Sequence, residues 1–87
     1  MKLVIAIVQD QDASAVVDGL VQREYRSTRI NTQGGFLKRG NATLLIGVED
    51  DQVPDVLQVI KENARRGGDG RAAGTIFVLN VARFVRV

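Results

Sequence analysis

The sequence lacks the residues that most enzymes use for acid–base, nucleophilic and metal chemistry. It contains no cysteine, which excludes disulfide bonds and thiolate metal sites. It contains no histidine, the commonest general base and metal ligand. Nucleophilic catalysis would need a tuned lysine beside serine or threonine, and neither Lys2, Lys38 nor Lys61 lies near an obvious partner. We therefore expect a protein that is not an enzyme and that binds no cofactor and no metal.

Strong charge of one sign and long apolar runs are also missing. The net charge of +2 is too small for a general DNA or RNA binder. RNA recognition on a sheet face would need exposed aromatic residues, and the expected strands supply only Phe77. No apolar run has the length of a membrane span, and the opening "MKLVIAIVQD" is too short for a signal peptide. The sequence thus predicts a cytoplasmic protein with no membrane, DNA or RNA partner.

The composition is otherwise that of an ordinary globular chain. Of the 87 residues, 45% are hydrophobic and 25% are charged. This length predicts one domain spanning residues 1–87. Because a core of this size is marginal, self-association would stabilise the fold.

Apolar periodicity predicts four main strands. Continuous apolar runs at 2–8, 42–48 and 75–81 indicate buried strands. The segment 26–32 places Thr28, Ile30 and Thr32 on one side, which is typical of a half-buried strand. The alternating tail 82–87 predicts a short edge strand.

Two amphipathic helices are expected between these strands. The first follows Asp12, a good N-cap residue, and the second has Pro54 in its first turn and ends near Gly67. The acidic residues near the starts of both helices are better explained as partners of the positive helix N-terminal ends than as ligands of a metal site. The apolar stripes are Ala13, Val16, Val17, Leu20 and Val21 in the first, and Val53, Val56, Leu57, Ile60 and Ala64 in the second.

The resulting order, β-α-β-β-α-β, predicts an α+β fold of the ferredoxin-like type. Two helices cover only one face of a four-stranded sheet. Three strands are nevertheless apolar on both sides, and a solvated second face would expose a large apolar patch. We therefore predict that this face is buried against other copies of the chain.

The stretch "TQGGFLKRGN", residues 32–41, has the residue types that bind an anionic aromatic ligand such as a nucleotide. Its glycines let backbone N–H groups approach a ligand, and Phe36 offers a stacking face. Asn41 and Thr28 can bind a base edge. The nearby cations suited to phosphate are Arg26, Arg29, Lys38 and Arg39. The alternative is a purely structural hairpin tip that packs on a neighbouring subunit.

Three segments resemble the cyclic di-AMP receptor family of PII-like bacterial signalling proteins. They are "MKLVIAIVQDQD", "TQGGFLKRGNATLLIGVEDD" and "TIFVLNV", and the pattern TGGFL-x-x-GN-x-T is the most distinctive part. The resemblance implies a ferredoxin-like, PII-like homotrimer that binds cyclic di-AMP in clefts between subunits. The ligand contacts it implies are Arg26, Thr28, Gly35, Phe36, Leu37, Asn41 and Gly47. Further candidates are Glu24, Lys38, Arg39 and Arg86.

Two features depart from the family pattern and leave alternatives open. Members often have asparagine where this chain has Glu24, and their segment before the last strand is much longer than residues 67–74 here. We expect a non-enzymatic sensor of cyclic di-AMP. One alternative is a PII-like sensor of another nucleotide such as ATP or ADP. The other is a ligand-free trimeric module whose hairpin docks a downstream protein partner.

Overall fold

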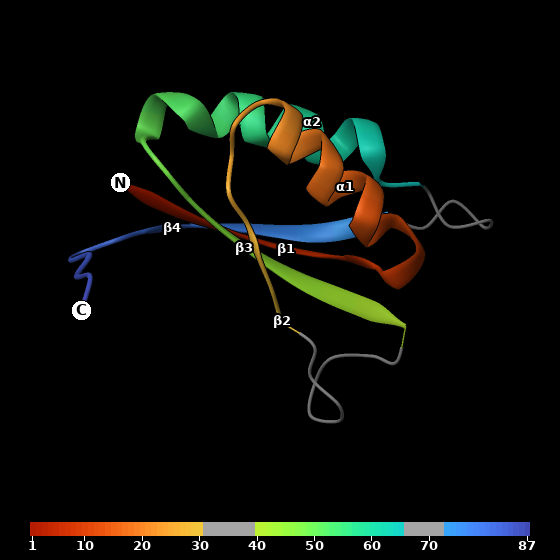
Figure 1. The fold of residues 1–87 in the computed structure, drawn as a ribbon, viewed down its shortest axis with the longest axis horizontal. Helices are drawn as coiled ribbons and strands as arrows, with labels where there is room; N and C mark the ends of the chain where they lie inside the picture. The colour runs from red at the N-terminus through yellow and green to blue at the C-terminus, as the bar shows by residue number, and fades with distance from the viewer. Residues whose placement is uncertain (31–39, 66–72) are drawn as a thin grey trace.

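A four-stranded antiparallel sheet covered on one side by two helices forms the fold, as Figure 1 shows. The computed structural model describes residues 1–30, 40–65 and 73–87. Its elements are β1 (Lys2–Gln9), α1 (Asp10–Gln22), β2 (Thr28–Ile30), β3 (Asn41–Val48), the 3₁₀ turn η1 (Asp50–Gln52), α2 (Val53–Asn63) and β4 (Gly74–Asn80). The strand order is β2-β3-β1-β4. The predicted α+β, ferredoxin-like β-α-β-β-α-β fold is therefore confirmed.

The core lies between the sheet and the helices. Alternate residues of the central strands point toward the helices, because side chains of a strand alternate between its faces. The helices contribute their apolar stripes to the same layer. Its buried members include Val4, Ala6, Val8, Leu44, Ile46, Val16, Leu20, Val56, Val59 and Ile60.

The predicted cap and apolar stripe of α1 were each wrong at one residue. The helix begins at Asp10 with Gln9 as N-cap and no side-chain cap bond. Asp12 is only 3% exposed, and its carboxylate accepts a hydrogen bond of 2.9 Å from the backbone N–H of Arg65. Val21 is 61% exposed whereas the preceding Leu20 is fully buried, so Leu20 and not Val21 faces the core in the last turn.

The end of α2 also differs from the prediction. The helix stops at Asn63, and Ala64 already has an extended backbone conformation. The hydrogen bond from Arg65 to Asp12 draws the chain out of the helix there. Pro54 lies in the first turn as predicted.

The two helices pack closely at Gly19. A Cβ atom at this position would lie 2.7 Å from Asn63 Nδ2 and 3.0 Å from Val59 Cγ1. Glycine costs about 1 kcal/mol in a helix interior relative to alanine. The close approach of α2 explains why glycine nevertheless stands here.

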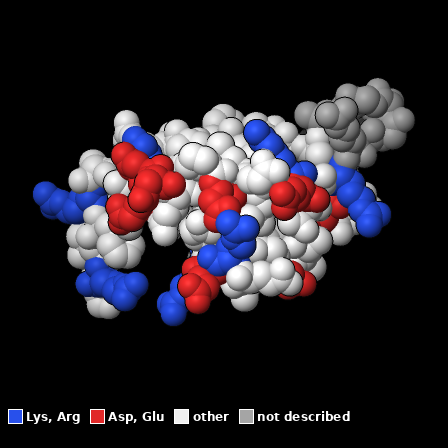
Figure 2. Space-filling view, turned by 90° about the horizontal axis from the view of Figure 1, so that it is seen from above, with Lys and Arg blue, Asp and Glu red and all other residues white. Residues whose placement is uncertain are grey.

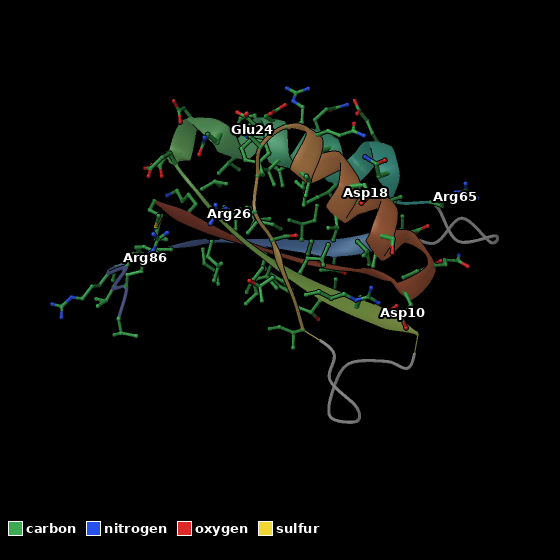
Figure 3. All side chains as sticks on the ribbon, in the orientation of Figure 1. Asp10, Asp18, Glu24, Arg26, Arg65 and Arg86 are labelled. Carbon is green, nitrogen blue, oxygen red and sulfur yellow. The ribbon has the colours of Figure 1, made fainter. Side chains whose placement is uncertain are left out.

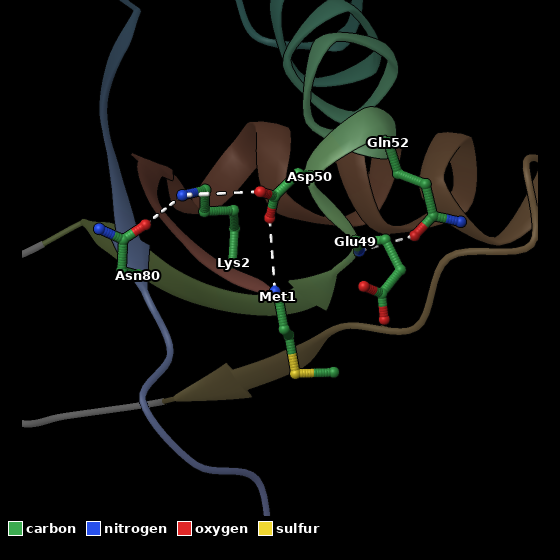
Figure 4. A network of polar contacts seen from close by, with 6 residues as sticks. All are labelled: Met1, Lys2, Glu49, Asp50, Gln52 and Asn80. Carbon is green, nitrogen blue, oxygen red and sulfur yellow. Dashed lines mark hydrogen bonds and ion pairs between the residues drawn. The ribbon is translucent and has the colours of Figure 1, made fainter.

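A polar network joins one end of the sheet to the start of α2 (Figure 4). The side chain of Lys2 donates to Asn80 and lies 3.9 Å from the carboxylate of Asp50. The amino group of Met1 lies 3.4 Å from the same carboxylate. Asp50 therefore connects β1 to the turn that precedes α2, and through Lys2 to β4.

The face of the sheet opposite the helices, called the open face below, is apolar. Its central row follows from the strand register, in which Ile5 pairs with both Leu45 and Phe77. Phe77 and Leu79 are 51% and 46% exposed. Figure 2, which looks onto the helices, shows acidic and basic side chains intermixed on the helix side. The two sides of the molecule thus differ in polarity, as the strand pattern predicted.

The predicted edge strand at 82–87 is wrong. The N–H of Val81 donates to the carbonyl of Met1, and no strand follows it in the described chain. The strands with a free outer edge are β2 and β4, and residues 82–87 pair with neither. Within the described residues, no helix is both long and apolar enough to cross a membrane.

Candidate ligand-binding site

Three of the predicted ligand contacts lie near one another, where β2 begins and β3 ends. Thr28 pairs with Leu45 in an antiparallel register. Arg26 lies two residues before Thr28, and Gly47 lies two residues after Leu45, so both lie toward the same end of the sheet. Arg26, Thr28 and Gly47 are all exposed to solvent.

Gly47 leaves open space on the surface of the single chain. A Cβ atom added to it would meet nothing within 4 Å. Glycine weakens a strand interior, since it has no side chain to pack and loses more entropy on folding. No contact with the described residues of its own chain therefore requires glycine at this position.

Asn41 lies at the opposite end of β3. It pairs with Gln9, six residues along the strand from Gly47. At the rise of a β-strand this separation is about 20 Å. Asn41 and Arg26 are therefore far apart on one chain. Between them on the open face, Thr43 is only 8% exposed, and its hydroxyl has no hydrogen-bond partner in the described part of the chain.

Five of the predicted site residues fall outside the described residues. They are Gly35, Phe36, Leu37, Lys38 and Arg39, all within 31–39. The short segment before β4 falls mostly within 66–72, which is also not described. Their proposed roles remain predictions.

The cations that are described differ in their availability. The guanidinium of Arg29 lies 3.2 Å from the carboxylate of Asp10, the first residue of α1. The guanidinium of Arg86 lies in the exposed tail, 5.8 Å from the centroid of the Phe84 ring. Arg26 has no hydrogen bond or ion pair with residues 1–30, 40–65 or 73–87. Arg86 likewise has no hydrogen bond or ion pair within the described chain, but Arg26 is the one that lies toward the same end of the sheet as Thr28 and Gly47.

An open groove of about 520 Å³ lies beside Arg26. It runs between α1 and the segment that leads to β2, on which Figure 3 shows Glu24 and Arg26. A second depression of about 220 Å³ shares Val17 and Ser27 with it. The residues lining the larger groove are Val17, Val21, Glu24, Tyr25, Arg26 and Ser27.

Glu24 takes a backbone conformation that usually belongs to glycine. Its φ of 65° lies in the left-handed region. Its N–H donates to the carbonyl of Val21, and the N–H of Tyr25 donates to that of Leu20. This is the Schellman pattern that ends a helix, with Glu24 at the position where glycine is preferred. Residues that keep such strain are often functional.

We expect Glu24→Gly to raise the free energy of unfolding by about 0.5–1 kcal/mol, because a left-handed conformation costs non-glycine residues roughly 1–2 kcal/mol. Part of that gain is lost to the greater freedom of glycine in the unfolded chain. Urea denaturation measures the change, with Glu24→Gln as the control that retains the strain. Equal stability of the glycine and glutamine variants would contradict the expectation.

A cluster that the sequence did not predict holds the segment before β2. One carboxylate oxygen of Asp55 accepts a hydrogen bond of 2.5 Å from the Arg23 guanidinium, and the other accepts one of 2.7 Å from the Tyr25 hydroxyl. The hydrogen bond to Asp55 raises the pKa of Tyr25 above its ordinary value, because ionised tyrosine could not donate it. Asp55 lies 30 residues from Tyr25 in the sequence, and no local motif marks the pair.

Comparison with known proteins assigns this architecture to a class. Residues 1–69 match the model of a family described as cyclic-di-AMP receptor. A GlnB-like protein from the nitrogen fixation nifHD region of Methanothermococcus thermolithotrophicus is 37% identical over 86 residues, covering 82% of each chain. The fold and these matches define a PII-like signalling or binding protein. The chain belongs to the cyclic-di-AMP receptor family, as the sequence resemblance predicted.

A solved structure is similar over almost the entire chain. It is the crystal structure of a functionally unknown protein from Pediococcus pentosaceus ATCC 25745, with 40% identity and a TM-score of 0.81. The match covers 99% of this chain and 96% of the other. The two chains therefore have similar lengths, so a comparably small form of the fold occurs in that protein as well.

Proposed function

We propose that this protein is a non-enzymatic receptor that binds cyclic di-AMP at the interfaces of a homotrimer. The observation that supports it most is the exposed apolar row on the open face, near Arg26, which pairs with no described residue, and the open space at Gly47. The family to which the chain belongs is named for this ligand.

Burial of the open face would be the driving force for association. Phe77 and Leu79 are about half exposed on the edge strand β4. Burying apolar surface contributes about 25 cal/mol per Å², so covering these side chains in an interface favours association. Copies that cover these faces would form interfaces at the edges of their sheets.

A site at an interface also accounts for the separation of the predicted contacts. Arg26 and Asn41 lie at opposite ends of the sheet on one chain. A neighbouring copy can bring its own end of the sheet close to the first copy's opposite end. One ligand could then contact Arg26, Thr28 and Gly47 of one chain together with Asn41 of the next.

Each residue type has a distinct role in this proposal. Phe36 stacks on a base, a contact worth about 1–3 kcal/mol per base in single-stranded nucleic-acid complexes. Arg26 pairs with a phosphate, assisted by Lys38 or Arg39. Thr28 and Asn41 bind polar edges, while Gly35 and Leu37 donate backbone N–H groups. Glu24 would repel a phosphate, but it can accept a hydrogen bond from an adenine amino group.

Ligand binding is tested by calorimetry and thermal unfolding with cyclic di-AMP, cyclic di-GMP, ATP and ADP. At a free ligand concentration of 100 times Kd, stabilisation is about 2.7 kcal/mol, which should raise Tm by about 10 °C or more. Phe36→Ala should lose this shift, and Phe36→Trp should retain it, because tryptophan preserves a stacking face. Mass spectrometry of small molecules extracted from the purified protein identifies the ligand independently. A shift with ATP or ADP but none with cyclic di-AMP would contradict the ligand assignment.

A further inference from the structure

Arg26, the proposed phosphate ligand, lies on a segment without regular secondary structure. Residues 23–27 connect α1 to β2 and belong to no helix or strand. The side chain of Arg26 is exposed and makes no polar contact with the described residues. Its position must therefore depend on the contacts of its neighbours in the chain.

The side chains of two of those neighbours donate to a single carboxylate. Arg23 and Tyr25, on either side of Glu24, donate to separate oxygens of Asp55 at 2.5 and 2.7 Å. The ring of Tyr25 also packs against the buried core. Asp55 thus binds the residue immediately before Arg26 and the residue three positions before it.

Asp55 is well placed to act as a rigid anchor. It lies in the first turn of α2, next to the buried Val56. Negative charge is favourable at this end of a helix. Its side chain is 31% exposed and that of Arg23 is 58% exposed, so the ion pair contributes little to global stability. The main consequence of the cluster is local, because it ties the side chains of Arg23 and Tyr25 to α2, in addition to the backbone hydrogen bonds that end α1.

We propose that Asp55 is a positioning residue of the ligand site, whose carboxylate holds Arg23 and Tyr25 and thereby directs Arg26 toward the bound phosphate. Asp55 itself touches no ligand in this arrangement. The proposal rests on the proposed function for its effect on affinity, whereas the effect on the segment itself is independent of any ligand.

The first test measures the segment in the ligand-free protein. Asp55→Ala should accelerate amide hydrogen exchange at Glu24 and Tyr25, whose N–H groups donate to the carbonyls of Val21 and Leu20, by about tenfold or more, since loss of the anchor allows local opening. It should also lower the pKa of Tyr25, which is the single tyrosine and is measurable by ultraviolet titration. Asp55→Asn keeps an acceptor for Tyr25 and should give a smaller change. Glu62→Gln, at an exposed acidic position farther along α2, is the matched control.

The second test is a double-mutant cycle on the affinity for cyclic di-AMP. Asp55→Ala should raise the Kd for cyclic di-AMP by about tenfold in the wild-type background. It should have no further effect in the Arg26→Ala background, because Asp55 acts through Arg26. If Asp55 had only a structural role, Asp55→Ala would lower the affinity for cyclic di-AMP by the same factor in both backgrounds.

The outcomes separate this inference from the proposed function. Unchanged amide exchange in Asp55→Ala would overturn the anchor with or without a ligand. Faster exchange, together with no binding of cyclic di-AMP by the wild type, would support the anchor and contradict the proposed function. If the wild type binds cyclic di-AMP, an unchanged Kd in Asp55→Ala, or an equal loss in both backgrounds, would overturn the positioning role.

Discussion

Phe77→Glu should convert the proposed trimer into folded monomers and abolish ligand binding. Phe77 lies on the open face, in register with Ile5, and is half exposed on the single chain, so the fold itself tolerates a polar residue there. In a trimer the same position would be buried in an apolar interface. An unpaired carboxylate in such surroundings costs several kcal/mol, and three copies would each contribute one. We expect the association constant to fall at least about 100-fold, which light scattering at micromolar concentration detects.

Val21→Glu is the matched control for this substitution. Val21 is 61% exposed but lies on α1, away from the open face. It should leave the oligomeric state unchanged. A Phe77→Glu protein that keeps the mass of the wild type, or one that associates no less than Val21→Glu does, would contradict burial of the open face.

Gly47→Val should weaken binding of cyclic di-AMP without destabilising the ligand-free protein. On the single chain a Cβ atom at this position meets nothing within 4 Å, and valine is favourable in a strand. The proposed ligand would occupy this space. Steric overlap of this kind costs about 1–3 kcal/mol, equivalent to a loss of about 10- to 100-fold in affinity. Calorimetry measures the affinity, and thermal unfolding without ligand measures the stability.

Thr43→Val is the control, on the same face of the same strand. The Thr43 hydroxyl has no partner in the part of the chain that is described, so this isosteric change should preserve both stability and affinity. Light scattering of both variants establishes whether they still associate. Unaltered affinity in Gly47→Val would show that the ligand does not lie against this strand.

The sheet and helices were predictable because each is determined by a local pattern. Apolar runs marked β1, β3 and β4, and Pro54 marked the first turn of α2. The strand order then followed from the connectivity typical of the ferredoxin-like fold. The apolar open face was also predictable, since successive residues of β1, β3 and β4 point to opposite faces of the sheet and both sets are largely hydrophobic.

Contacts between distant residues were not predictable from such patterns. Asp12 resembles an N-cap locally, but its partner Arg65 lies 53 residues away. The role of Asp55 similarly depends on Arg23 and Tyr25, which precede it by about 30 residues. The alternation in the tail was typical of a strand, yet a strand also needs a pairing partner, and residues 82–87 pair with neither of the two edge strands.

The candidate site was predicted in part by residue type and by family resemblance. Strand register explains why Arg26, Thr28 and Gly47 lie toward one end of the sheet. It equally explains why Asn41 does not join them on one chain. The sequence did not reveal the left-handed backbone of Glu24, because glycine is the residue that usually marks this position at a helix end, and glutamate gives no such signal.

The central claim is that identical chains bury their open faces against one another and hold cyclic di-AMP at the interfaces. Native mass spectrometry with added cyclic di-AMP measures both parts in one spectrum. We expect a species of three times the 9.5 kDa chain mass, carrying up to three ligands. A single 9.5 kDa species without ligand, at concentrations where the wild-type protein is folded, would contradict the claim.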